Sequence, residues 1–164
     1  MKFQPIIDIH ASWLAVNPLQ GCINGCSYCF LSTYDLHNKN PMKLCSPSDA
    51  INMLLNYKYY DEESIVCFFT LTDIFLNEET IKYFKDILKE INNKRLKNTL
   101  VFITKLLIPD KVIEILNNME QNVIIYLSYS GLDSSFEKEI NHDNILCNFS
   151  RLFNKNIKVI HYWR

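Results

Sequence analysis

The 164-residue sequence predicts an α/β fold, an open partial (β/α) barrel of about five parallel βα units. Two observations predict it: short β-branched apolar runs alternate with amphipathic segments after residue 60, and the chain is short for a closed barrel. An eight-unit barrel takes about 250 residues, or roughly 31 per unit, so this length holds about five units. We therefore expect one domain, residues 1–164, that does not close on itself.

The predicted strands are continuously apolar rather than alternating, which is typical of parallel strands covered by helices. The segments between them are long enough for helical crossovers, which join parallel strands with a right-handed connection. We therefore expect a parallel sheet. Its strands span residues 13–16, 64–69, 99–104, 122–127 and 157–163.

Four helices are expected between the strands, each with apolar residues at helical spacing. Ser48 and Asp49 are expected to cap the first helix, and Pro109 to open the third. The second and fourth helices span residues 78–92 and 144–153. Because each apolar stripe must be buried, these helices should pack on the sheet.

The sequence stops at the end of an apolar strand, on Trp163 and Arg164. Natural termini more often trail into polar residues or a docked helix, so we expect that a C-terminal unit is missing or is supplied by a second chain. A naturally short protein is the alternative. Arg164 is a candidate to bind a carboxylate or phosphate with both guanidinium nitrogens, or else a frayed terminal residue.

Composition excludes several classes of protein. Hydrophobic residues make up 48% and charged residues 21%, which is the ordinary globular mix. No apolar run approaches the roughly 18 residues of a membrane span, and Asp8 and His10 interrupt the N-terminus where a signal peptide is apolar. The net charge of −1 gives no bulk electrostatic case for nucleic acid. His10 and His142 are expected to be surface residues without a functional partner.

Six cysteines in a chain of this size do not suit a dense disulfide scaffold. We therefore expect free thiols and a cytoplasmic protein. Cys22, Cys26 and Cys29 lie within eight residues in the spacing C-x3-C-x2-C. Three thiolates on one tight loop can each take one iron of a cubane cluster, and the fourth iron is then free to bind a substrate or cofactor. Gly21 and Gly25 allow the loop to fold closely around the metal.

Two alternatives to the cluster remain open. The three thiolates together with His37 or Cys45 could hold zinc, which would make the chain a zinc-stabilised binding module. The chain could instead be an inactive or incomplete fragment that needs a partner chain.

The cysteine spacing, with the aromatic Tyr28 directly before the third cysteine, resembles the signature of the radical S-adenosylmethionine superfamily. The resemblance implies a [4Fe–4S] cluster and S-adenosylmethionine as cofactors, with the latter chelated at the open iron. It implies reductive cleavage to a 5′-deoxyadenosyl radical, and an electron donor of the flavodoxin or ferredoxin type. It also implies a six-unit (β/α) barrel, of which this chain would be a truncated form.

The resemblance also suggests where S-adenosylmethionine binds. Lys105 would pair with its carboxylate, and Ser128 would form a hydrogen bond nearby. Thr72 and Asp73 follow the second strand, where the superfamily contacts the amino group, and Tyr28 would lie beside the adenine. Three of these residues also have a simple structural alternative: an N-cap or turn for Asp73, a side chain reaching to solvent for Lys105, and packing behind the cluster for Tyr28.

A narrower resemblance is to spore photoproduct lyase and related DNA-photolesion repair proteins. It is the only basis for a nucleic-acid partner. Leu71 stands where that family carries its hydrogen-donor cysteine, so either Tyr126 or Tyr129 is the donor or the substrate is not a thymine dimer; we favour the second. The catalytic residue and the substrate stay unassigned. The similar segments are residues 21–33, 70–75, 102–105 and 126–128.

Overall fold

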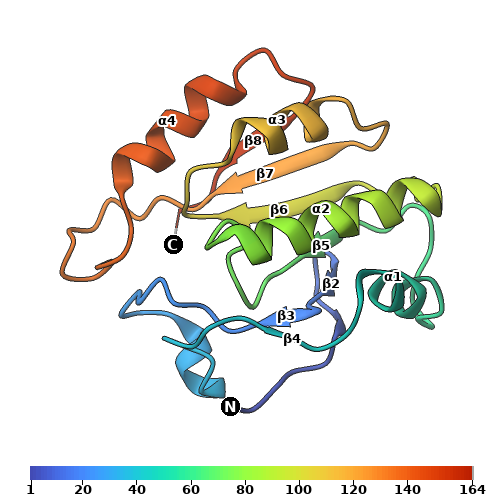
Figure 1. The fold of residues 1–164 in the computed structure, drawn as a ribbon, viewed down its shortest axis with the longest axis horizontal. Coiled ribbons are helices and arrows are strands. Elements are labelled where there is room, and N and C mark those ends of the chain that lie inside the picture. Colours follow the sequence, from blue (N-terminus) through green and yellow to red (C-terminus); the bar gives the residue numbers. More distant parts are fainter. Residues whose placement is uncertain (164) are drawn as a thin grey trace.

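The computed structural model describes residues 1–163, which form a six-stranded sheet, a two-stranded sheet and four α-helices (Figure 1). The predicted anion contact of Arg164 lies outside the described residues. Five strands of the large sheet are parallel and one edge strand is antiparallel. In spatial order the strands are β1 (Ile7–Ile9), β2 (Leu14–Val16), β5 (Val66–Phe68), β6 (Leu100–Thr104), β7 (Val123–Leu127) and β8 (Lys158–His161).

The register of the parallel strands aligns apolar side chains in rows. Alternate residues of a strand point to opposite faces, so residues paired across the sheet share a face. One face is buried in the main hydrophobic core. Its two rows are Leu14, Val66, Leu100 and Val123, and then Val16, Phe68, Phe102 and Ile125.

Buried residues of all four helices also belong to this core. α2 and α3 lie in front of the strands in Figure 1, and α1 packs against α2. This arrangement confirms the expected open α/β layer, in which right-handed crossovers place the helices on the sheet. The helices are α1 (Pro47–Leu55), α2 (Glu78–Asn93), α3 (Asp110–Asn117) and α4 (His142–Leu152).

The N-terminus of α1 differs from its prediction. Pro47 is the first helical residue, and the hydroxyl of Ser46 accepts a hydrogen bond from the Asp49 backbone N–H at 3.1 Å. The expectation that Ser48 and Asp49 cap this helix is therefore wrong. Proline suits the first position because its missing N–H would have no helical partner there, and this moves the cap to the preceding serine.

Four elements were not predicted, and each is short. β1 pairs with β2, so the expectation of a parallel sheet fails at this edge. β3 (Leu19–Gln20) pairs with β4 (Met42–Lys43), and a 3-10 helix, η1, spans Phe30–Tyr34. Segments of two to five residues carry too little periodicity to be recognised locally.

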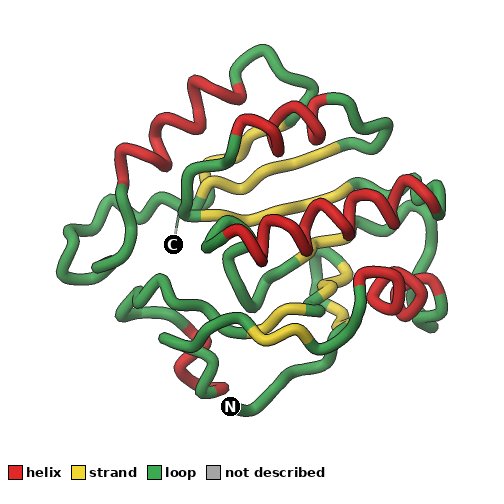
Figure 2. Tube along the Cα trace, viewed as in Figure 1, coloured by secondary structure: helices red, strands yellow, loops and turns green. Residues whose placement is uncertain are grey.

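The carboxyl ends of β6 and β7 point to the same side of the molecule, on the left in Figure 1. Long loops gather on that side, drawn green in Figure 2. They include the segment that carries the cysteine trio and the connection from β7 to α4. None of the helices in residues 1–163 combines the length and hydrophobicity needed to cross a bilayer.

Candidate cofactor site

The cysteine loop leaves β3 through two glycines with positive φ. Gly21 has φ +116°, and a Cβ there would lie 2.8 Å from the carbonyl oxygen of Asn40. Gly25 has φ +66°. The Cys29 backbone N–H then donates to the Cys26 carbonyl at 3.0 Å, which closes a tight turn. The glycines are needed because other residues rarely adopt this conformation, and at Gly21 the neighbouring backbone leaves no space.

The three cysteines line one cavity of about 470 Å³ at the carboxyl ends of the parallel strands. The same cavity is lined by every residue predicted to contact S-adenosylmethionine. The tertiary structure thus brings together eight residues that the sequence spreads over more than one hundred positions. They are Cys22, Cys26, Tyr28, Cys29, Thr72, Asp73, Lys105 and Ser128.

Two of the thiols are held in their neutral form. Burial raises the pKa of Cys22 to about 12, although backbone N–H groups near its sulfur oppose the shift. Burial also raises the pKa of Cys26 to about 11, and the Lys105 ammonium counteracts part of that change. Because the thiolate is the form that binds metal, metal binding here must displace these protons. Three thiols on one cavity, with a nearby cation, fit an iron–sulfur cluster bound by three cysteines.

The two ligands suggested for zinc lie elsewhere. Neither His37 nor Cys45 lines the cavity, although the backbone of His37 forms a bridge with Cys22. Within residues 1–163, no three His, Cys, Asp or Glu side chains are grouped so that they could hold a single metal ion.

Asn17 follows β2 and joins that strand to the loop after β5. Its side-chain oxygen accepts hydrogen bonds from the Thr70 N–H at 2.8 Å and from the Thr70 hydroxyl at 3.1 Å. The chain reaches this position by a sharp bend at Phe69, whose φ is +65°. A bulky residue in the left-handed region is strained, and such strain is found where the surrounding structure imposes the conformation.

Asp73 is buried at the same rim. Its carboxylate accepts hydrogen bonds from the Thr104 hydroxyl and from the backbone N–H groups of Lys105 and Phe75. Burial raises the pKa of Asp73, and these hydrogen bonds act in the opposite direction. The predicted turn role is therefore present, since the bond to the Phe75 N–H closes a local turn. Nearby, the buried Thr72 hydroxyl has no hydrogen-bond partner among the described residues.

Lys105 already has an anionic partner within the chain. Its ammonium lies 2.6 Å from the carboxylate of Glu137 and donates to the Ser128 carbonyl at 3.1 Å. Although burial opposes the charge, the bond to Glu137 raises the pKa of Lys105. Glu137 also accepts a hydrogen bond from the Tyr28 hydroxyl. Burial and that bond raise the pKa of Tyr28.

The structure also corrects the expectation for His142. Its Nε2 lies 2.6 Å from the Glu137 carboxylate, and the side chain is largely buried rather than free on the surface. His10 is exposed, as expected, and lines the cavity opening beside Asp8.

Sequence reasoning missed two residues of this region. Asn17 had a usable signal, since a polar residue directly after a predicted strand falls at the rim where α/β sites lie. Glu137 had no such signal, because it lies in the irregular connection between β7 and α4. No periodic sequence pattern predicts the path of such a connection. Its position is decided by contacts with residues from three other segments.

A mostly parallel α/β sheet with three cysteines in a cavity at the carboxyl ends of its strands defines the class of partial-barrel proteins. The family model described as the radical SAM superfamily matches residues 16–162, nearly the whole chain. The chain therefore belongs to this superfamily and is an enzyme. No curated protein and no solved structure matches it. Enzymes of this superfamily use a [4Fe–4S] cluster and S-adenosylmethionine, and generally need a reductant such as flavodoxin or ferredoxin.

Proposed function

We propose that this enzyme binds a [4Fe–4S] cluster through Cys22, Cys26 and Cys29 and cleaves S-adenosylmethionine reductively. The observation that carries the proposal is that all three thiols share one cavity with polar groups from the ends of β5, β6 and β7. When bound, the cluster supplies one electron that splits S-adenosylmethionine into methionine and a 5′-deoxyadenosyl radical. The chain itself supplies the ligands and the orientation of the cofactor.

We assign the methionine end of the cofactor to the charged strand ends. Lys105 carries the positive charge for the carboxylate, and Ser128 lies next to it. Asp73 carries the negative charge for the amino group, while its oxygens also bind Thr104 and the Lys105 backbone. The unpartnered hydroxyl of Thr72 supports a contact of its own with the ligand, since a buried polar group without a hydrogen bond is costly.

We assign the adenine to Tyr28. Its ring lines the cavity between two cysteine ligands, and its hydroxyl is held by Glu137 on the other side. An aromatic ring fixed at one end offers a flat apolar surface to a nucleobase.

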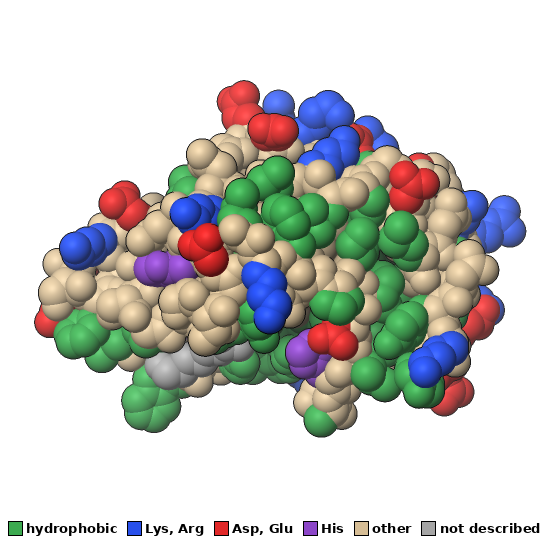
Figure 3. Space-filling view, turned by 90° about the horizontal axis from the view of Figure 1, so that it is seen from below, with side chains coloured by type: hydrophobic (Ala, Val, Ile, Leu, Met, Phe, Trp, Pro, Cys, Tyr) green, Lys and Arg blue, Asp and Glu red, His purple; other side chains and the backbone are tan. Residues whose placement is uncertain are grey.

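The substrate differs, in our proposal, from that of spore photoproduct lyase. Leu71, where the resemblance would place that family's hydrogen-donor cysteine, lines the cavity and packs near Cys22 and Cys29. A leucine side chain cannot return a hydrogen atom to a substrate radical as a thiol can. The charge distribution gives no support for nucleic acid either: on the face shown in Figure 3, basic and acidic side chains are scattered among hydrophobic ones.

The test is the formation of 5′-deoxyadenosine. The protein is reconstituted with iron and sulfide without air, then incubated with S-adenosylmethionine and dithionite, and the products are measured by mass spectrometry. We expect methionine and 5′-deoxyadenosine in equal amounts. A protein that retains a full cluster and binds S-adenosylmethionine but forms neither product would contradict the proposal.

A variant of this proposal involves a complementing segment or chain. β8 is the last strand of the sheet, and among residues 1–163 only β7 pairs with it. The outer edge of β8 therefore has backbone groups that a further strand from another βα unit can pair with. If such a unit is required, a second polypeptide supplying it should raise 5′-deoxyadenosine formation, whereas a complete enzyme should not respond.

A further inference from the structure

The connection from β7 to α4 brings one carboxylate into a fully enclosed position. The Glu137 side chain is 0% exposed, and each of its oxygens has two partners. One oxygen binds Lys105 at 2.6 Å and the Tyr28 hydroxyl, while the other binds the Ser130 hydroxyl at 2.7 Å and His142 at 2.6 Å. A buried carboxylate is tolerated only with such compensation.

Glu137 lies behind the cavity rather than in it. Tyr28, Lys105 and Ser128 line the cavity, whereas Glu137, Ser130 and His142 do not. A ligand in the cavity therefore meets the tyrosine ring and the lysine, and Glu137 acts on the ligand only through them.

The Lys105 ammonium is held in place before a ligand arrives. Its N–H groups donate to the Glu137 carboxylate and the Ser128 carbonyl, and the Tyr28 hydroxyl is a third partner. The ammonium also lies 5.6 Å from the centre of the Tyr28 ring. A free lysine side chain samples many rotamers, so fixing it before the ligand arrives removes an entropic cost of binding.

A second contact ties the same connection to the cysteine loop. The backbone N–H of Ser27, the residue after Cys26, donates to the carbonyl of Phe136, the residue before Glu137, at 2.8 Å. The Tyr28 hydroxyl bond lies next to it. The connection therefore holds the loop between Cys26 and Cys29 from outside the cavity.

We propose that Glu137 is a positioning residue for the cofactor site, holding Lys105 and Tyr28 where they receive the methionine carboxylate and the adenine of S-adenosylmethionine. The inference rests on the proposed function and adds to it a residue that touches no cofactor. The alternative is that Glu137 only neutralises Lys105. If Glu137 only neutralises Lys105, removing its negative charge should tighten the binding of the anionic carboxylate of S-adenosylmethionine. If Glu137 positions Lys105 and Tyr28, the same change should weaken that binding.

The first test measures affinity for S-adenosylmethionine on reconstituted protein by equilibrium dialysis. Glu137→Gln should weaken binding about tenfold with unchanged iron content. In a Lys105→Met background, where only Tyr28 is left to position, the same substitution should cause a clearly smaller further loss. Tighter binding by Glu137→Gln, or an equal loss in both backgrounds, would overturn the proposal.

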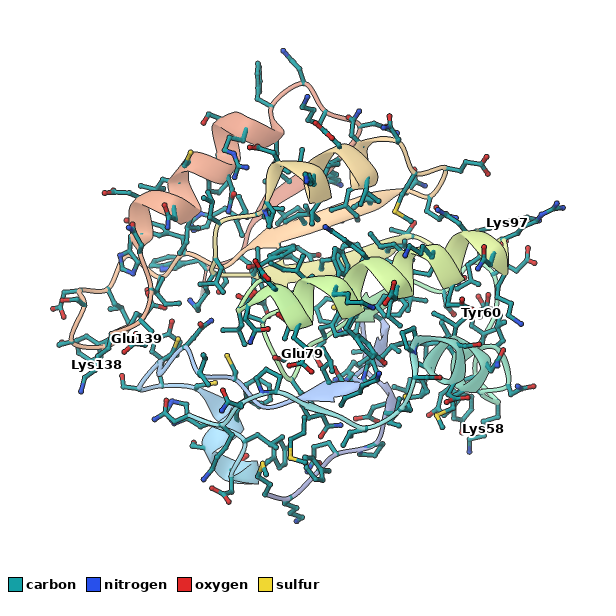
Figure 4. The ribbon with its side chains drawn as sticks, viewed as in Figure 1. Lys58, Tyr60, Glu79, Lys97, Lys138 and Glu139 are labelled. Carbon is teal, nitrogen blue, oxygen red and sulfur yellow. The ribbon has the colours of Figure 1, made fainter. Side chains whose placement is uncertain are left out.

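The matched control is Glu139→Gln, the same chemical change two residues along the same connection. Glu139 is exposed, and Figure 4 shows it with Lys138 on the outer part of the loop. This variant should bind S-adenosylmethionine as the wild type does. If Glu137→Gln does not accumulate as folded protein, Glu137→Asp keeps the charge but withdraws the carboxylate, and should also weaken binding.

The second test uses cluster-free protein and needs no cofactor. Lys105 is acetylated with limiting acetic anhydride, and the rate is followed by peptide mass spectrometry. The rate at Lys105 should rise several-fold in Glu137→Gln and stay unchanged in Glu139→Gln. An unchanged rate in Glu137→Gln would show that Glu137 does not hold the ammonium.

The outcomes separate the two proposals. A wild-type protein that holds iron but binds no S-adenosylmethionine overturns the proposed function and this inference with it. A wild type that binds S-adenosylmethionine and a Glu137→Gln variant that binds it equally well overturn the inference alone.

Discussion

The hydroxyl of Thr104, the last residue of β6, lies 2.9 and 3.0 Å from the two carboxylate oxygens of Asp73, which follows β5. The same carboxylate accepts the Lys105 backbone N–H at 2.8 Å. Asp73 therefore joins the carboxyl ends of two neighbouring strands at the wall of the cavity. A residue predicted for ligand contact is also part of the framework that positions Lys105.

Replacing Asp73 with alanine should lower stability. The change leaves the Thr104 hydroxyl and two backbone N–H groups without their buried acceptor, and we expect a loss of about 2–4 kcal/mol in the free energy of unfolding. Urea unfolding of cluster-free protein measures it. Glu114→Ala, an exposed carboxylate on α3, is the control and should change stability by less than about 0.5 kcal/mol. Equal effects of the two substitutions would show that the Asp73 contacts contribute little.

Alanine at Gly21 should disrupt the cysteine loop. The added Cβ would lie 2.8 Å from the Asn40 carbonyl oxygen, so the backbone must shift and cluster loading should fall to a small fraction of wild type. Gly131→Ala is the matched control, since Gly131 also has positive φ (+70°) but its nearest neighbour lies at 4.0 Å. That variant should lose about 1 kcal/mol of stability and keep its iron. Iron analysis after reconstitution distinguishes them; normal loading of Gly21→Ala would mean that the loop adapts.

Cys26→Ala should abolish retention of the cluster, because two thiolates cannot hold a cubane in the cavity. Cys147→Ala, which removes an exposed thiol from α4, should have no effect on iron content or visible absorption. Both variants are reconstituted and desalted without air before iron and sulfide are measured. Full iron retention by Cys26→Ala would refute the assignment of this residue as a ligand.

Glu137 should make stability depend on pH in the acid range. Burial opposes its charge, but bonds from Lys105, Tyr28 and Ser130 lower its pKa to about 2, below the value of about 4.3 for an unfolded glutamate. A lowered carboxyl pKa contributes stability above the unfolded pKa, and that stability is lost as the pH falls toward 2. The gap in urea midpoint between wild-type and Glu137→Gln protein, both without cluster, should therefore shrink between pH 5 and about 2. A gap that stays constant would mean that the carboxylate is not stabilised in its charged form.

Much of the fold follows from local sequence. Each buried strand is a continuous apolar run, and α2 carries its apolar stripe and its Asn77 cap within a few residues. The arrangement of the five parallel strands could also be predicted, because their order along the chain is their order in the sheet. β1 and the β3–β4 pair could not, since strands of two or three residues carry too little periodicity to be recognised.

The sequence by itself determined the cysteine trio, the α/β alternation and the polar residues that end the strands, because spacing and periodicity are properties of neighbouring residues. Tertiary structure alone decided that Lys105 faces Glu137, that His142 has a partner, and that Asp73 joins two strands. Contacts of this kind depend on the path of irregular connections, which is set by the burial of polar groups against distant segments and not by any local pattern.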